Sequence, residues 1–370
     1  MPWNRAKELY NKILPGADPG SLAFDLAVAV SADARCEHKP LMGITVNPPS
    51  SGKTVSQEFT PRDRVVGDVT KAGIFGAEID SKTKEVRPTG ILAQLGNGCE
   101  AVVHVPDISQ LVANSAVKED IYALLRDVHD GHAVRTFNGV DIQWSGRVSF
   151  CVCATGVGVD QPVTGLGERF IYYRPFPGSL AWREARKIRD NSPAVKTELK
   201  RICKELVKLG RENYVNTKLP DDLDHLIEDC ADFTAMARTA VPRDRYYRDV
   251  NGPVEREEPF RLANCFEIVG RSLLAMGVPE AEVAEVVRRV ATSTVVPALR
   301  LDLIRAVHLD GVHERFTTYL DVKRTTTDRT LEDLVQAGVF YEVPGGRGRG
   351  NYAHYYLTEE FKTFASNVLI

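Results

Sequence analysis

Four short apolar runs constrain the fold of this chain more than any other feature. They are "LMGITV", "EAVVHVPD", "RVSFCVCAT" and "ERFIYYRPF", which begin at residues 41, 100, 147 and 168. Runs that are apolar throughout are typical of strands buried on both faces. Helical patterns, such as residues 117–131 closed by Gly131, lie between them. The alternation predicts an α/β fold, a parallel sheet with helices on both faces.

The character of the sequence changes twice along the 370 residues. Residues 1–180 hold the apolar runs and form the expected α/β domain. Residues 181–294 are mostly helical and highly charged, which indicates a helical lid or linker region. Residues 295–370 read as helix, turn, helix, strand, a Gly/Arg-rich loop and a closing strand, an order that predicts a winged-helix domain.

Charge and cysteine usage exclude some classes of protein. The formal net charge is -3, so any surface that binds DNA must be a local patch. Seven cysteines without a C-x-x-C pair fit a reducing compartment, and Cys151 and Cys153 would face one side of a strand, where core packing is expected. The run "LAFDLAVAV" is interrupted by Asp25, and no stretch reaches the length of a membrane span. We therefore expect a soluble cytoplasmic protein without a membrane partner.

The segment "NPPSSGKTVS" directly follows the first apolar run. It matches the phosphate-loop pattern G-x-x-x-x-G-K-[S/T] except at its first position, where Asn tolerates the left-handed backbone that Gly would adopt. A loop of this type binds ATP: the Gly lets the backbone approach the phosphates, the Lys contacts them and the Thr coordinates Mg²⁺. The alternative is a surface turn. The predicted loop consists of Asn47, Pro48, Pro49, Ser50, Ser51, Gly52, Lys53 and Thr54.

Two further polar residues follow apolar runs. Asp107 ends the second run, where a Mg²⁺ ligand is needed beside a phosphate loop, although Pro106 is awkward at the end of a central strand and no Glu follows to activate water. The alternative is an Asp that caps the next turn. Thr155 ends the third run, and it would orient the attacking water or contact the γ-phosphate. The alternative is a Thr that forms a hydrogen bond at the strand end.

A β-hairpin is predicted between the second and third motifs, because Asn138-Gly139 lies between two β-type runs. Phosphate loop, strand-Asp, hairpin, strand-Thr and then "LGERFIYYRP" resemble the ATPase core of AAA+ proteins. The chain is most similar to the branch with a hairpin before the third motif, as in minichromosome-maintenance (MCM) replicative helicases and related ATPases of mobile elements. The resemblance covers roughly residues 20–180 and, more loosely, "VEREEPFRLANCFEIVGRSLLAMG".

The resemblance implies two arginines that act on nucleotide. Arg169 would be the arginine finger that reaches the ATP of a neighbouring subunit, and Arg261 would be the lid arginine. A guanidinium suits both roles because it stabilises charge on phosphate oxygens. The alternatives are an ion pair of Arg169 with Glu168 or a lid acid, and a surface salt bridge of Arg261 with Glu257 or Glu258. The resemblance also implies a homo-oligomer, with a hexameric ring as one form.

Five arginines are candidate DNA contacts. In the family that the chain resembles, the hairpin points into the channel of a ring and touches DNA, and a plain solvent-exposed hairpin is the alternative. The predicted recognition helix and wing would also reach phosphates or a groove, although winged helices serve as protein-contact modules as well. The candidates are Arg135 and Arg147 of the hairpin, Arg329 of the helix, and Arg347 and Arg349 of the wing.

Together these features predict an ATP- and Mg²⁺-dependent ATPase that acts on DNA as an oligomeric, helicase- or translocase-like motor. One alternative is a DNA-binding regulator that uses nucleotide only as a switch. Another is an interaction platform whose winged helix binds protein. The residues expected to carry catalysis are Lys53, Asp107, Thr155, Arg169 and Arg261.

Overall fold

The computed structural model describes most of the chain. The described residues are 2–47, 55–67, 69–108, 115–155, 169–176, 178–180, 182–244, 246, 249–310, 322–344 and 353–369.

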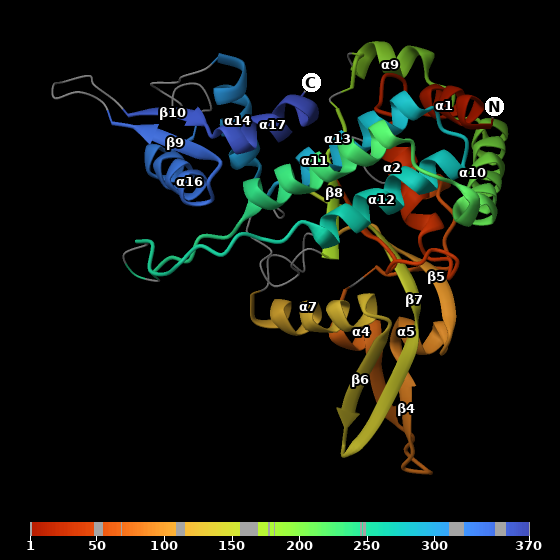
Figure 1. Ribbon diagram of the computed structural model, residues 1–370. Coiled ribbons are helices and arrows are strands. Elements are labelled where there is room, and N and C mark those ends of the chain that lie inside the picture. The colour runs from red at the N-terminus through yellow and green to blue at the C-terminus, as the bar shows by residue number, and fades with distance from the viewer. Residues whose placement is uncertain are drawn as a thin grey trace.

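A central sheet organises the molecule (Figure 1). Its order is β2 (Arg64–Val65), β5 (Cys99–Val105), β7 (Val140–Ala154), β1 (Met42–Val46) and β8 (Phe170–Tyr173). Each of these strands is parallel to its neighbours, and only β6 (His132–Phe137) is antiparallel, paired with β7. The mostly parallel α/β sheet expected from the four apolar runs is confirmed.

The central strand β1 packs tightly against helix α2 (Gly20–Val30). All five residues of β1 and all eleven of α2 are buried. A β-carbon built on Gly43 would lie 2.7 Å from Cγ2 of Val28 and 2.8 Å from Cζ of Phe24. Glycine is therefore required here because the helix approaches the strand backbone more closely than a side chain permits.

Helices cover both faces of the sheet. Those on the α2 side share one buried apolar cluster with the sheet and with the C-terminal segment. The changes of sequence character near residues 180 and 294 are therefore not breaks in the core. The helices that follow the sheet, together with the first helix, are α1 (Pro2–Ile13), α9 (Trp182–Ile188), α10 (Pro193–Asn213), α11 (Asp221–Arg238), α12 (Phe260–Ala275) and α13 (Glu280–Thr294), with a 3-10 turn at Tyr214–Asn216.

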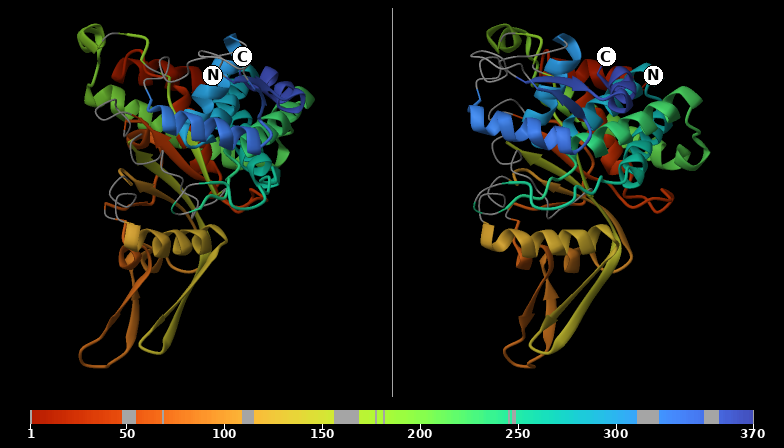
Figure 2. Two further views of the ribbon diagram at one scale, coloured as in Figure 1. Left: turned by 90° about the vertical axis from the view of Figure 1, so that its left-hand side faces the viewer. Right: turned by 60° about the vertical axis from the view of Figure 1, so that its left-hand side comes forward.

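The opposite face carries α4 (Lys71–Phe75), α5 (Gly90–Leu95) and α7 (Ser115–His129), and two hairpins project beside them (Figures 1 and 2). The predicted β6–β7 hairpin is confirmed, since Asn138 and Gly139 have φ angles of 49° and 78°. Strand β7 continues from the hairpin into the central sheet without a break.

The second hairpin, β3 (Gly76–Ile79) and β4 (Val86–Thr89), was not predicted. Its strands have only four residues each, and they contain Gly76 and Pro88, so the alternation of apolar and polar residues is weak.

The C-terminal segment has the expected order of helix, helix, strand and strand. Its elements are α14 (Ala298–Asp310), α16 (Arg324–Gln336), and the antiparallel strands β9 (Phe340–Val343) and β10 (His354–Leu357). An additional helix, α17 (Glu359–Val368), packs on α11, where Phe361 stacks on Phe233 with ring centroids 5.0 Å apart.

Two expectations about individual residue types can be compared with the structure. Cys151 and Cys153 are fully buried with free thiols, which confirms their core-packing role. Among the described helices, none combines the length and the apolar character needed to cross a membrane.

The close contact at Gly43 predicts a stability effect. Gly43→Ala should lower the free energy of unfolding by about 1–3 kcal/mol, because overpacking forces α2 away from β1. Gly67→Ala is the matched control, since no atom of the described residues, its chain neighbours apart, lies within 4 Å of the position that its β-carbon would take. Urea denaturation of the wild type and both variants measures the difference. Equal midpoints for all three proteins would show that α2 is free to shift.

Candidate functional site at the carboxyl edge of the sheet

Three predicted site residues meet at one edge of the sheet. Asn47 follows β1, Thr155 follows β7, and Asp107 lies two residues beyond β5. The N–H of Asn47 donates to the carbonyl of Ala154 (3.2 Å), and the N–H of Ile108 donates to β7 (3.0 Å). Neighbouring strands lie about 4.8 Å apart, so Thr155 stands between the other two polar residues.

Asp107 is exposed at this edge. Pro106 lies just outside β5, so its missing N–H removes no bond from the sheet. Both Asp107 and Thr155 have further interactions within the protein.

The remaining loop residues, Pro48, Pro49, Ser50, Ser51, Gly52, Lys53 and Thr54, lie outside the described residues. Helix α3 (Val55–Phe59) begins directly after them, with Ser56, Gln57 and Phe59 buried. The loop is therefore preceded by a buried parallel strand and followed by a helix.

The strand order places this edge where ligands bind in open α/β sheets. From β1 the chain crosses to the edge strand β2 and returns through β5 and β7, and β8 is then added on the other side of β1. The connection that leaves β1 and the connection that leaves β7 run in opposite directions along the sheet. Ligands of open α/β sheets bind at the carboxyl ends of strands where the connections diverge in this way. The predicted phosphate loop begins at this point of the sheet.

A buried carboxyl group connects the elements on either side of the predicted loop. Asp25 of α2 is fully buried; its Oδ1 accepts a hydrogen bond from Oγ1 of Thr45 (3.2 Å) in β1, and it also interacts with Ser56 in α3. Burial raises the pKa of Asp25 to about 7, although the two hydroxyl contacts oppose the rise. Asp25 thus links the helix before the loop, the strand that leads into it and the helix that follows it. In the sequence, the single acid within the apolar run of α2 was the feature that could have indicated this buried carboxyl group.

Arg169 lies at the opposite edge of the sheet. It directly precedes β8, whose Phe170 pairs with Met42 at the start of β1. Four residue steps of about 3.3 Å separate Met42 from the end of β1, a distance of about 13 Å. The Nη2 of Arg169 is 3.0 Å from Oδ2 of Asp130, an ion pair that the sequence did not indicate, and Glu168 lies outside the described residues.

Arg261 lies in the first turn of α12 and has further interactions within the protein. Besides burial, the positive charges of Arg261 and Arg169 both lower the pKa of His129. Burial is the main reason that the pKa of His129 falls to about 4; Asp130 opposes this fall, and the two arginines add to it. The structure therefore brings both predicted nucleotide arginines near one corner of the amino edge.

Arg135 and Arg147 both contact backbone in the body of the protein. The guanidinium of Arg135 donates to two carbonyls of α4. The Nη2 of Arg147 donates to the carbonyls of Ser31 (3.1 Å) and His38 (2.7 Å). These contacts hold the base of the hairpin in place, and a DNA contact by either side chain stays a prediction.

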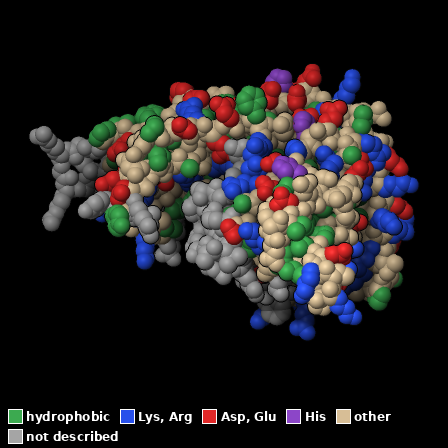
Figure 3. Space-filling model, turned by 90° about the horizontal axis from the view of Figure 1, so that it is seen from below, with side chains coloured by type: hydrophobic (Ala, Val, Ile, Leu, Met, Phe, Trp, Pro, Cys, Tyr) green, Lys and Arg blue, Asp and Glu red, His purple; other side chains and the backbone are tan. Residues whose placement is uncertain are grey.

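The β3–β4 hairpin presents basic residues that the sequence analysis missed. Oδ1 of Asp80 accepts the N–H groups of Lys82 (2.8 Å) and Thr83 (2.9 Å), which fixes the turn and leaves Lys82 and Lys84 exposed. Seen from the hairpin side, Lys and Arg side chains are numerous, with acidic side chains among them (Figure 3). The run "EIDSKTKEVR" contained the signal: an Asp-initiated turn between two short strands.

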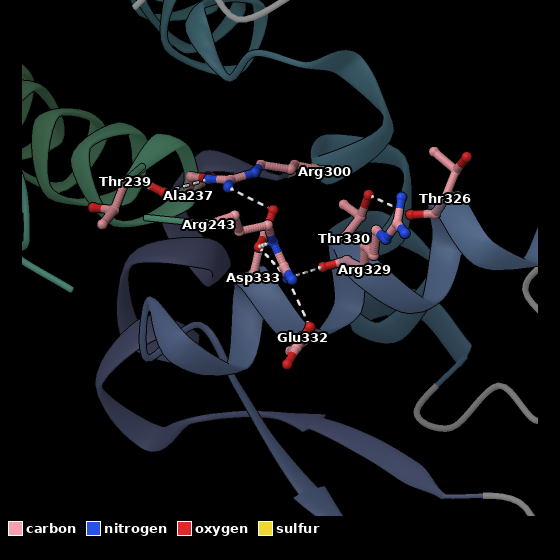
Figure 4. Close-up of polar contacts among 9 residues, drawn as sticks. All are labelled: Ala237, Thr239, Arg243, Arg300, Thr326, Arg329, Thr330, Glu332 and Asp333. Carbon is pink, nitrogen blue, oxygen red and sulfur yellow. Dashed lines mark hydrogen bonds and ion pairs between the residues drawn. The ribbon is translucent and has the colours of Figure 1, made fainter. Parts of the chain in front are cut away.

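The C-terminal half of α16 takes part in a polar network with two arginines from elsewhere in the chain (Figure 4). Arg243 donates to the carbonyl of Arg329 (3.2 Å) and to carboxylate oxygens of Glu332 and Asp333 (both 2.7 Å). Arg300 of α14, which is buried, donates to Asp333 (3.3 Å) from the other side. The side chain of Arg329 is exposed, but its neighbours on the helix are engaged in this network. Arg347 and Arg349 lie outside the described residues.

Comparisons with known proteins add no family to this description. A scan against protein-family models finds no match, and a search of curated proteins finds none either. Within the described ranges, no group of three or more His, Cys, Asp or Glu residues is placed to hold a metal ion.

The environment of Asp25 predicts a pH effect on stability. Its pKa is about 7 in the folded protein and close to 3.8 when unfolded, so the folded state holds the proton more tightly between these values. Its contribution to stability therefore falls as pH rises from about 4 to 7, by up to about 4 kcal/mol. Asp25→Asn should abolish this fall. The free energy of unfolding of the variant minus that of the wild type should therefore be higher at pH 8 than at pH 4.

Urea denaturation at pH 4, 6 and 8 measures this difference. Asp127→Asn, an exposed position on α7, is the matched control. The variant-minus-wild-type comparison isolates Asp25, because groups such as His129 titrate in both proteins. Parallel pH profiles for the wild type and Asp25→Asn would contradict the prediction.

Proposed function

We propose that this protein is an ATPase that works on DNA as an oligomer. The observation that carries the proposal is the carboxyl edge of the sheet, where a buried strand leads into Gly52-Lys53-Thr54 and a helix follows. Asp107 and Thr155 end the two strands next in order from β1. A phosphate loop has this strand-loop-helix context, and acidic and hydroxyl groups beside it complete a site for phosphoryl transfer.

The residues fit ATP and Mg²⁺ by chemical type. Lys53 would contact the β- and γ-phosphates, and Thr54 and Asp107 supply the oxygen ligands that Mg²⁺ prefers. When bound, Mg²⁺ neutralises charge on the phosphate oxygens. Thr155, whose strand lies between those of Asp107 and Asn47, would orient the attacking water.

The placement of the arginines supports action between subunits. Arg169 and Arg261 influence one corner at the amino edge, whereas the predicted phosphate loop of the same chain begins at the carboxyl edge. An arginine that starts about 13 Å back along the sheet and points at Asp130 is badly placed for its own loop. We infer that both arginines serve the nucleotide of a neighbouring subunit, with a closed ring as the natural assembly.

The two projecting hairpins support DNA as the partner. They lie side by side on the same side of the molecule (Figure 2), and Lys82 and Lys84 are exposed at the tip of one of them. Mobile ammonium groups on projecting loops can contact phosphates without reading sequence. In the proposed assembly, nucleotide-driven movement of the subunits would move these hairpins along DNA.

A regulator that uses nucleotide only as a switch is the second candidate. It is favoured by Ile108, which stands where a water-activating Glu would follow Asp107. ATP turnover measured with and without single- and double-stranded DNA separates the candidates: DNA-stimulated turnover supports the motor, and ATP binding without turnover supports the switch.

Lys53→Ala tests the phosphate loop. The variant should fold normally but lose ATP affinity, by about tenfold or more, because a charge-assisted contact to phosphate is lost. Calorimetric titration with Mg²⁺-ATP measures the affinity. Lys208→Ala, an exposed lysine on α10, is the matched control. If wild type and Lys53→Ala bind ATP equally well, the segment from Asn47 to Thr54 is a surface turn.

Arg169→Ala tests action between subunits. This variant should bind ATP but hydrolyse it poorly, and mixing it with Lys53→Ala subunits should restore part of the activity. Each mixed interface can then combine an intact loop with an intact arginine. Asp130→Asn is the control for the ion pair, because it removes the partner but keeps the guanidinium.

Two results would contradict a finger role. One is the absence of recovery at every mixing ratio, once mixed assemblies are demonstrated by mass measurement. The other is an equal loss of turnover in Arg169→Ala and Asp130→Asn, which would assign the effect to the ion pair.

A further inference from the structure

A cavity lies between the helical region and the C-terminal segment. It has a volume of about 390 Å³ and is lined by side chains of α13, α14 and α17 and by Phe176, which follows β8. A volume of this size is within the range of small-molecule sites. None of the described residues assigned to the ATPase site lines it.

Three arginines dominate the lining of this cavity. Arg288 and Arg289 come from α13, and Arg305 comes from α14. Glu285 is the one acid among the described residues of the lining, and it is exposed. Within the part of the chain that the structure describes, no carboxylate forms an ion pair with any of the three guanidiniums. The cavity therefore holds a surplus of positive charge.

The orientation of two guanidiniums is fixed by neutral groups. Nε of Arg288 donates to the carbonyl of Asn367 (2.8 Å), and Nε of Arg289 donates to the carbonyl of Arg174. The guanidinium carbon of Arg289 also lies 3.9 Å from the centre of the Phe176 ring. These contacts hold the arginine side chains in place without neutralising them, which is the preorganisation that anion binding needs.

Burial and mutual repulsion affect these groups. Burial lowers the pKa of Arg289 and of Arg305, and the charge of Arg305 lowers that of Arg289 further. Asp302 acts in the opposite direction on Arg305, and Tyr173 and Asp18 do so on Arg289. A bound anion would relieve the repulsion between the guanidiniums.

We propose that this cavity binds the phosphate group of a ligand of about nucleotide size. Planar guanidiniums bind phosphate oxygens in pairs, which favours phosphate over a simple halide. Phe176, whose side chain is partly exposed, and Val368 provide an apolar wall for the organic part of the ligand. The phosphate can come from a free nucleotide or from a single-stranded nucleic acid, since both carry the same chemistry beside an aromatic ring. The proposal does not depend on ATP hydrolysis.

The test uses the full chain with Lys53→Ala, so that the phosphate loop does not contribute. AMP is titrated calorimetrically at constant ionic strength, and inorganic phosphate serves as the simpler probe. Arg305→Gln should weaken AMP binding about tenfold or more, because a charged hydrogen-bond donor is lost. Arg201→Gln, an exposed arginine of α10, is the matched control and should leave the affinity unchanged. Arg305→Lys keeps the positive charge, so its AMP affinity should lie between those of Arg305→Gln and Arg201→Gln.

Equal AMP affinity in Arg305→Gln and Arg201→Gln would overturn the proposal. The proposal would also be overturned if neither AMP nor inorganic phosphate bound. If Arg305→Gln does not fold, Arg289→Gln and Arg305→Lys provide the same comparison. A short single-stranded oligonucleotide identifies the source of the phosphate: displacement of AMP indicates nucleic acid, and retention of AMP indicates a free nucleotide. If this test fails but the wild type still binds ATP, the proposed ATPase function is not contradicted.

Discussion

The burial of strand β1 is the constraint on which the rest of the structure depends. This strand is hydrogen-bonded along both edges, to β7 and β8, and it is covered on both faces. One face meets α2 so closely that Gly43 has no room for a side chain. A strand enclosed in this way can present polar groups only beyond its ends, because an unpaired polar group on either face would lose its hydration. Chemistry is thereby directed to the edges of the sheet.

The two edges hold different chemistry. Asn47, Asp107 and Thr155 gather at the carboxyl edge, where the predicted phosphate loop begins. Arg169 lies at the amino edge, where its charge and that of Arg261 both act on His129. The strands therefore separate the parts proposed to bind a subunit's own nucleotide from those proposed to act on its neighbour's. This separation is a physical reason for an ATPase of this design to work as an assembly.

Many arginines of this chain bind backbone carbonyls of the protein itself. Arg147 contacts the segment before β1, and Arg300 contacts the carbonyls of Ala237 and Thr239 at the end of α11. Carbonyls near a helix C-terminus lack intrahelical partners, so a guanidinium there satisfies groups that burial would otherwise leave unpaired. Such residues resemble nucleic-acid contacts in a sequence. In the folded chain they hold helices, strands and the C-terminal segment together.

The sequence alone determined the parallel sheet, the β6–β7 hairpin and the polar residues at the strand ends. These features follow from local patterns: continuous apolar runs, the Asn138-Gly139 turn, and a change from apolar to polar at Asp107 and Thr155. The tertiary structure alone decided the strand order, the pairing of Arg169 with Asp130, the buried position of Asp25 between α2, β1 and α3, and the arginine-lined cavity. Each of these depends on contacts between segments far apart in the chain, and periodicity carries no information about which segments meet.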